Sequence, residues 1–136
     1  MGSLMDIAIE AVNLHYRKQY NEAIKLLDSY FAYLTKKEDL AQFHTDYALN
    51  YEKLKDIEKC NYHREEAVRL FHCGSYSYER LIKNYVKAKD WKNALRICDT
   101  VLKRKNVFKH KPTWEVIRSY ALKRKEFILK QIQKEL

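Results

Sequence analysis

The hydrophobic positions of this chain recur at three- and four-residue intervals along most of its length, the spacing of helices that bury one side. The clearest stretch runs from Asn84 to Leu102 and holds two such helices, separated by a polar break at Lys89 and Asp90. Asp90 stands where its side chain can accept hydrogen bonds from the free N–H groups that begin the second helix. The apolar stripe of that helix comprises Trp91, Ala94, Leu95, Cys98, Val101 and Leu102.

The same spacing along the whole chain predicts an all-α protein of seven helices, with antiparallel neighbours and no strand. Two glycines and one proline in 136 residues leave too few turn residues for an all-β fold. We expect two helix pairs before the stretch described above, at about 4–18 with 20–34 and at about 39–54 with 57–71, and one longer helix from Pro112 onward. The side chains predicted to face inward include Ile7, Val12, His15, Phe31, Tyr47, Cys60, Tyr78, Leu81, Ile117, Leu122 and Phe127.

The helix pairs form an internal repeat. Asp56 precedes Asp90 by 34 residues, which is the period of the tetratricopeptide repeat. A further copy of the pattern lies upstream. The small residue that follows the turn is Ala23 in this copy and Cys60 in the next, 37 residues later. Over about 4–105 the chain therefore resembles the tetratricopeptide repeat (TPR) family.

This resemblance implies a right-handed superhelix, or α-solenoid, of about three TPR helix-turn-helix pairs with a C-terminal capping helix. The repeats would cover about 4–37, 38–74 and 75–105, and residues 106–136 would form a basic linker and the capping helix. A terminal helix with a polar outer face is what such an array needs to end without an exposed apolar surface. We interpret residues 1–3 as a remnant of a cloning vector.

Proteins of the TPR family bind other chains in a concave groove lined by the first helix of each pair. The resemblance therefore implies a protein–protein interaction module, or scaffold, that holds a peptide segment or a partner helix. In a variant of this hypothesis, the chain is the sensing part of a bacterial peptide-responsive regulator. Asp46, Ile9 and Tyr76 depart from the family's pattern for clamping a chain-terminal carboxylate, which argues against that activity. The predicted partner-binding groove comprises Asn13, Asp46, Tyr76, Glu79, Arg80, Lys83 and Lys87.

Positive charge is concentrated at the C-terminal end. Residues 103–136 contain 11 Lys and Arg against 3 Asp and Glu, whereas residues 1–102 contain 16 against 15. The alternative hypothesis is therefore a nucleic-acid or acidic-protein binder that acts through the basic C-terminal helix. A solvated capping helix explains the same charges without a ligand. The predicted basic patch comprises Arg118, Lys123, Arg124, Lys125 and Lys130.

The sequence offers little for catalysis or for a cofactor. It lacks a nucleophile elbow, an HExxH motif and a glycine-rich phosphate loop, so we expect no enzyme and no cofactor. Cys60 and Cys98 fall on apolar helix faces and are predicted core residues. Cys73, with His72 and His63, falls short of the four ligands of a zinc site, so we expect no bound metal.

No apolar run approaches the ~18 residues of a membrane-spanning helix, and we expect a cytoplasmic protein without membrane contact. The identity of the partner and the oligomeric state stay open.

Overall fold

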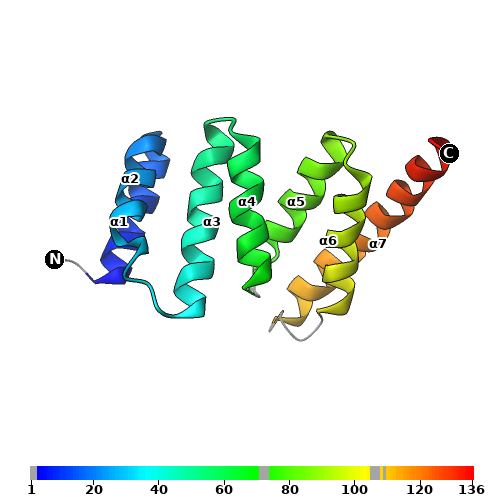
Figure 1. Cartoon of the computed structure of the whole chain (residues 1–136). Coiled ribbons are helices and arrows are strands. Elements are labelled where there is room, and N and C mark those ends of the chain that lie inside the picture. Colours follow the sequence, from blue (N-terminus) through cyan, green and yellow to red (C-terminus); the bar gives the residue numbers. More distant parts are fainter. Residues whose placement is uncertain (1–2, 71–73, 105–107, 109) are drawn as a thin grey trace. The chain divides into compact units, whose positions relative to one another are not determined.

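The computed structural model describes residues 3–70, 74–104, 108 and 110–136. Within these residues the chain forms seven α-helices and no strand, which confirms the all-α prediction (Figure 1). The predicted bounds agree to within a few residues, and the predicted end of the fourth helix, residue 71, lies outside the described residues. The helices are α1 (Leu4–Tyr16), α2 (Tyr20–Phe31), α3 (Lys37–Lys53), α4 (Ile57–Arg69), α5 (Tyr76–Lys87), α6 (Trp91–Lys103) and α7 (Lys111–Lys134).

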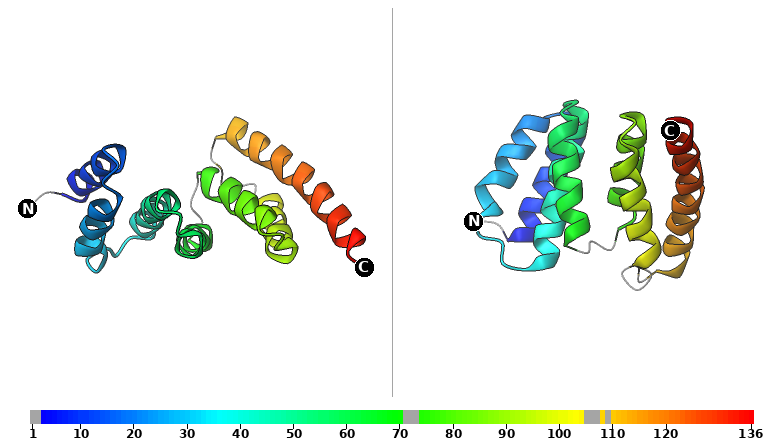
Figure 2. Two further views of the ribbon diagram at one scale, coloured as in Figure 1. Left: turned by 90° about the horizontal axis from the view of Figure 1, so that it is seen from above. Right: turned by 45° about the vertical axis from the view of Figure 1, so that its right-hand side comes forward.

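The helices gather into two compact units, residues 1–72 and 73–136. In the first unit, α1 with α2 and α3 with α4 form antiparallel hairpins, and α3 also packs against α1 and α2 (Figure 2). In the second unit, α6 packs against both α5 and α7, and α5 also contacts α7. The division between the units lies between α4 and α5, where the sequence predicts the boundary between the second and third repeats.

The three hairpins share one turn. After α1, α3 and α5 a lysine takes a left-handed conformation, with φ of 63° at Lys18, 62° at Lys55 and 57° at Lys89. The lysine N–H and the next residue's N–H donate back to two carbonyls of the last helical turn, as Lys89 does to Val86 at 3.0 Å and Asp90 to Tyr85 at 2.8 Å. This pair of bonds is the Schellman ending of a helix, and it normally carries glycine because a side chain strains the left-handed conformation.

The residue after each lysine also begins the next helix. Asp90 accepts a hydrogen bond from the N–H of Asn93 at 3.2 Å, which confirms the predicted cap. Asp56 accepts one from Lys59 at 3.1 Å at the start of α4. Gln19, at the same place before α2, makes no such side-chain bond. Two of the three turns therefore end one helix and cap the next within three residues.

A second kind of cap begins α1. Ser3 accepts from the N–H of Asp6 at 3.2 Å, and the Asp6 carboxylate accepts from the N–H of Ser3 at 3.1 Å. This reciprocal arrangement is a capping box, which satisfies two of the backbone donors that a helix start leaves unpaired. Ser3 therefore stabilises the helix that follows it.

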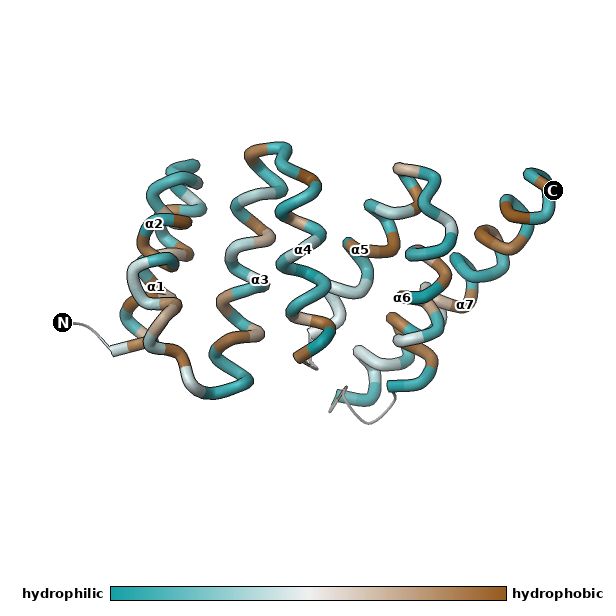
Figure 3. The backbone as a smooth tube through the Cα atoms, viewed as in Figure 1, coloured by the Kyte–Doolittle hydropathy of each residue, from teal (hydrophilic) through white to brown (hydrophobic). Residues whose placement is uncertain are grey.

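Each unit has its own apolar core. Figure 3 shows apolar segments recurring along every helix between polar ones. The first core gathers Ile7 and Ala11 of α1, Ile24 and Leu27 of α2, Leu34, and Phe43 and Tyr47 of α3. In the second unit the fully buried apolar side chains are Tyr78, Leu81, Ile82, Ala94, Ile97, Cys98, Val101, Ala121 and Ile128. Cys60 and Cys98 are buried free thiols, as predicted.

Three residues predicted to face inward do not. Val12 in α1 is exposed, and so are Leu122 and Phe127 in α7. α1 has apolar residues on every side, and only the side that carries Ile7 and Ala11 meets the core. On α7 the buried positions are Ile117, Ala121 and Ile128, so the buried stripe is narrower than the apolar one.

The left-handed lysines generate a stability prediction. We expect Lys89→Gly to raise the free energy of unfolding by about 0.5–1 kcal/mol. Glycine removes a left-handed strain of about 1–2 kcal/mol, but it also loses more conformational entropy on folding than lysine does, and this loss offsets part of the gain. Lys123→Gly, in the middle of α7 of the same unit, should instead lower it by about 1 kcal/mol. Urea unfolding followed by circular dichroism measures both variants. Equal losses would show that Lys89 is not strained.

Candidate functional site

One side of α1 carries an exposed apolar stripe, which we define as Met5, Ile9, Val12 and Tyr16. Their exposed fractions are 73%, 54%, 41% and 77%. Spacings of four, three and four residues place the side chains on one face of the helix. An apolar helix face that nothing covers typically marks a place where another chain binds.

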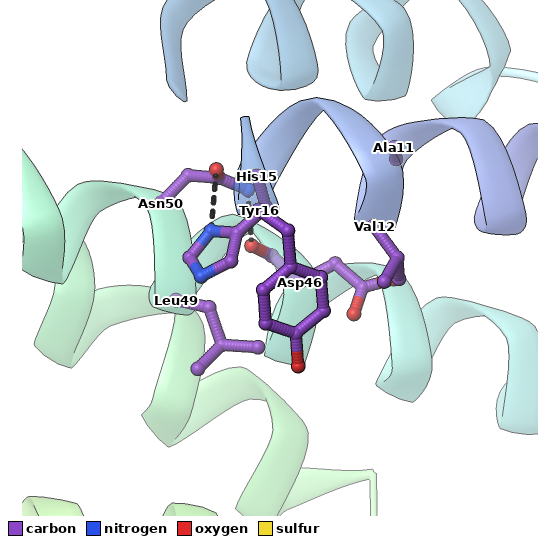
Figure 4. A pocket seen from close by; sticks show the side chains of 7 residues that line it. All are labelled: Ala11, Val12, His15, Tyr16, Asp46, Leu49 and Asn50. Atoms are coloured by element: carbon purple, nitrogen blue, oxygen red, sulfur yellow. Dashed lines mark hydrogen bonds between the residues drawn. The ribbon is translucent and has the colours of Figure 1, made fainter. Parts of the chain in front are cut away.

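A cavity of about 120 Å³ adjoins this stripe, between α1 and α3. Val12 and Tyr16 belong both to its wall and to the stripe, and Leu49 of α3 adds a further apolar wall. Figure 4 shows the side chains of Tyr16 and Leu49 beside a hydrogen-bonded pair, His15 Nδ1 and Asn50 Oδ1, which are 2.9 Å apart. The full lining is Ala11, Val12, His15, Tyr16, Asp46, Leu49 and Asn50.

Asp46 contributes the carboxyl group of the cavity lining and is only 7% exposed. Its Oδ1 accepts a hydrogen bond from Gln42 Nε2 at 3.1 Å, and its backbone carbonyl accepts one from Asn50 Nδ2 at 2.8 Å. Burial raises the pKa of Asp46 to about 6, although the Gln42 hydrogen bond and the nearby His15 act in the opposite direction. The sequence predicts a solvent-facing groove residue here. The structure corrects this, because α3 has neighbours on both sides and Asp46 faces α1.

Two histidines form a second polar feature, which sequence reasoning missed. Their Nδ1 atoms, on His44 of α3 and His63 of α4, lie 2.9 Å apart, so the N–H of one ring donates a hydrogen bond to the nitrogen of the other. Tyr47 and Tyr51 stack on the His63 ring, with centroids 4.6 and 5.5 Å away. The Tyr47 hydroxyl in turn donates to Asp28 Oδ1 at 2.7 Å. Burial lowers the pKa of both histidines, that of His63 to about 4.

A buried arginine in α4 was also missed. Arg64 is fully buried, and its Nη2 donates to Glu52 Oε2 of α3 at 3.1 Å. Its place in the sequence, one of three charged residues in a row, gives no sign of this burial. Arg64, Glu52 and the histidine pair join α3 to α4 and lie apart from the cavity lining.

The predicted groove residues divide between the two units. Asn13 is exposed on α1, outside the cavity lining, and Asp46 lies in the cavity. The other five lie on α5 of the second unit, where Glu79 pairs with Lys83 at 3.1 Å. Arg80 lies over the Tyr76 ring at 5.9 Å, and Lys87 is exposed in the last turn.

The predicted basic patch lies along α7, and its members have different surroundings. Arg118 stacks over Trp114 at 5.6 Å, and Arg124 stacks over Tyr120 and Phe127 at 5.7 and 5.5 Å. Two lysines are paired with acids, Lys125 with Asp99 at 2.7 Å and Lys130 with Glu126 at 3.4 Å. Lys123 is exposed. Part of the positive charge is therefore already balanced within the second unit.

Among the residues described, no group of three or more His, Cys, Asp or Glu side chains is arranged to hold a metal ion. His72 and Cys73, which were considered above as zinc ligands, lie outside the described residues. None of the described helices combines the length and the apolar character needed to cross a bilayer.

Comparisons of this chain with protein-family models, with curated proteins and with solved structures find no match.

The burial of Asp46 generates a prediction about stability and pH. The pKa of Asp46 is about 6 in the fold and near 3.8 in the unfolded chain, so its contribution to stability is full below pH 3.8 and is lost as pH rises through 6. We therefore expect Asp46→Asn to stabilise the first unit at neutral pH, on the order of 1–3 kcal/mol. The gain over the parent should disappear at acidic pH. A loss of stability at neutral pH in urea unfolding would contradict this.

The histidine pair acts in the opposite sense. The pKa of His63 is about 4 in the fold and 6.5 in the unfolded chain, so its contribution to stability is full above 6.5 and is lost as pH falls toward 4. Acidification in this window should weaken the joint between α3 and α4. In an NMR titration, the His63 ring signals should shift near pH 4. Titration of His63 near 6.5 would show that the pair is not buried.

Proposed function

We propose that this protein is a protein–protein interaction module, and that the face formed by α1 and α3 of the first unit binds a peptide segment or a helix of its partner. The observation that carries this proposal is the exposed apolar stripe of α1 beside the cavity that contains Asp46. A stripe of this spacing offers one turn after another for the apolar side chains of a docked helix, the usual way an amphipathic helix is recognised.

The resemblance to the TPR family supports the same proposal, because members of that family bind other chains. In this proposal the helix pairs stack into the right-handed superhelix described for the family, with α7 as its cap. The repeated turn at Lys18, Lys55 and Lys89 supports such an array, because the lysines are 37 and 34 residues apart. The groove residues of α5 stay a prediction, as does a cytoplasmic location.

The basic helix α7 is a second candidate, favoured by the stacking of Arg118 and Arg124 on aromatic rings. Such stacked guanidinium groups bind phosphates and carboxylates well, because the ring fixes the plane of their donors. Nucleic acid or an acidic protein would be the ligand. The ion pairs of Lys125 and Lys130 make this the weaker proposal.

Two tyrosines of equal exposure provide the test. Tyr16 belongs to the α1 stripe, whereas Tyr33 lies beyond the end of α2, and both are 77% exposed. A displayed library of random peptides of about 16 residues, long enough for about four helical turns, is selected on the purified full chain. We expect Tyr16→Ser to weaken the selected peptides at least tenfold, as interface anchors do, and Tyr33→Ser to leave them unchanged.

The same measurements on Lys123→Glu separate the two candidates. If this variant loses binding while Tyr16→Ser retains it, α7 is the working surface. If neither Tyr16→Ser nor Lys123→Glu differs from Tyr33→Ser, the proposal fails for both surfaces.

A further inference from the structure

We infer that the peptide bound by the first unit carries a lysine or arginine, and that this side chain enters the cavity between α1 and α3 to pair with Asp46. This inference rests on the proposed function and specifies the chemistry of the partner. It depends on the geometry of the cavity and on the bonds already made by its polar groups.

The polar groups of the cavity leave one place for a cationic ligand. His15 and Asn50 are bonded to each other at 2.9 Å, and the Asn50 amide also donates to the backbone carbonyl of Asp46. Asp46 Oδ1 accepts from Gln42, whereas Oδ2 accepts no hydrogen bond from any of the residues that the structure describes. The carboxylate therefore keeps acceptor capacity in the wall of the cavity.

A buried carboxylate needs a positive partner or must stay protonated. Among the described residues no lysine or arginine forms an ion pair with Asp46, whereas the fully buried Arg64 is paired with Glu52. The first unit thus pairs the buried charge of Arg64 with Glu52, between α3 and α4, but provides no lysine or arginine partner for Asp46 among the described residues. A partner side chain that brings the charge would form a charge-assisted hydrogen bond, about twice as strong as a neutral one.

The shape of the cavity fits the same kind of side chain. At about 120 Å³ it can take several water molecules, and therefore the end of a long side chain. Ala11, Val12 and Leu49 line it with apolar groups. Lysine and arginine bury an aliphatic stem and keep a charged end, so the stem would meet these walls while the charge reaches Asp46.

The surroundings also disfavour an acidic peptide. Asp46 is the acidic residue of the cavity lining. An acidic side chain at the cavity would meet this carboxylate, and like charges so placed repel.

Binding of a cation should depend on pH through the groups that face the site. Asp46 from α3 has a pKa raised to about 6 by burial, and His15 from α1 is the other titratable group close to it. Above pH 6 Asp46 is ionised and can pair. On acidification Asp46 becomes neutral, and this change weakens a bound cation.

The experiment selects the same library of random peptides on the parent chain and on its Asp46→Asn variant, with Glu38→Gln as the matched control. Glu38 is exposed near the start of α3, and its replacement removes the same charge from the same helix. We expect lysine and arginine to be enriched at one position of the peptides selected on the parent and on Glu38→Gln. The enrichment should be absent on Asp46→Asn.

The affinity of a selected peptide gives the second measurement. Replacing its enriched lysine by glutamine should weaken binding to the parent about tenfold, the effect of roughly 1.4 kcal/mol, and should not weaken binding to Asp46→Asn. For the parent, affinity should fall as pH is lowered from about 7.5 to about 5, through the pKa of Asp46.

The outcomes distinguish a failure of this inference from a failure of the proposed function. Selected peptides that need Tyr16 but show no preference for lysine or arginine would overturn this inference and leave the proposed function standing. A preference for basic residues that persists on Asp46→Asn would overturn it as well. If the library yields no peptide bound above a selection without protein, both the inference and the proposed function fail.

Discussion

Each helix pair depends on a turn in which a lysine takes the left-handed backbone conformation that glycine usually occupies. The N–H of this lysine and the N–H of the next residue donate to two carbonyls in the last turn of the preceding helix, and so close it. In two of the turns the residue after the lysine is an aspartate, Asp56 or Asp90, whose side chain caps the start of the next helix. Because three residues reverse the chain direction, the two helices of a pair must lie side by side. The alternation of buried and exposed side chains along each pair follows from this geometry.

Helix α3 is the element on which the first unit is built, and it combines burial with polarity. Eight of its residues are buried, and His44, Thr45, Asp46 and Asn50 are polar. Neighbours on both sides cause this burial, since α1 and α2 lie against one side and α4 against the other. Toward α4, His44 is hydrogen-bonded to His63 and Glu52 is paired with Arg64. The polar groups toward α1 are satisfied in part, which is why the binding proposals concern that side.

The sequence predicts well whatever depends on near neighbours. The helix pairs, the cap at Asp90 and the buried thiols follow from spacings of three, four and 34 residues, and these can be seen without the fold. The seven helices likewise follow from apolar periodicity. The exposure of Val12 does not, because α1 is apolar on every side and periodicity cannot choose which side meets the core.

The features that sequence reasoning missed all involve residues far apart in the chain. His44 meets His63 across 19 residues, and His15 meets Asn50 across 35. The burial of Asp46 and Arg64 results from the packing of α1 and α4 against α3, whereas their own sequence neighbourhoods look polar. A carboxylate in a polar stretch is ordinarily solvated, so no local pattern distinguishes Asp46 from Glu38. Only the tertiary structure makes that distinction.

The short turns also determine how this chain would find its fold. Each hairpin joins helices that are adjacent in sequence, so most of the contacts that define it close small loops of chain. Chains dominated by such contacts reach the native state quickly, because little conformational entropy is lost before the first favourable contacts form. With a separate core in each unit, folding can start in either one without waiting for the other. The repeated lysine turn thus gives the chain several independent places at which folding can begin.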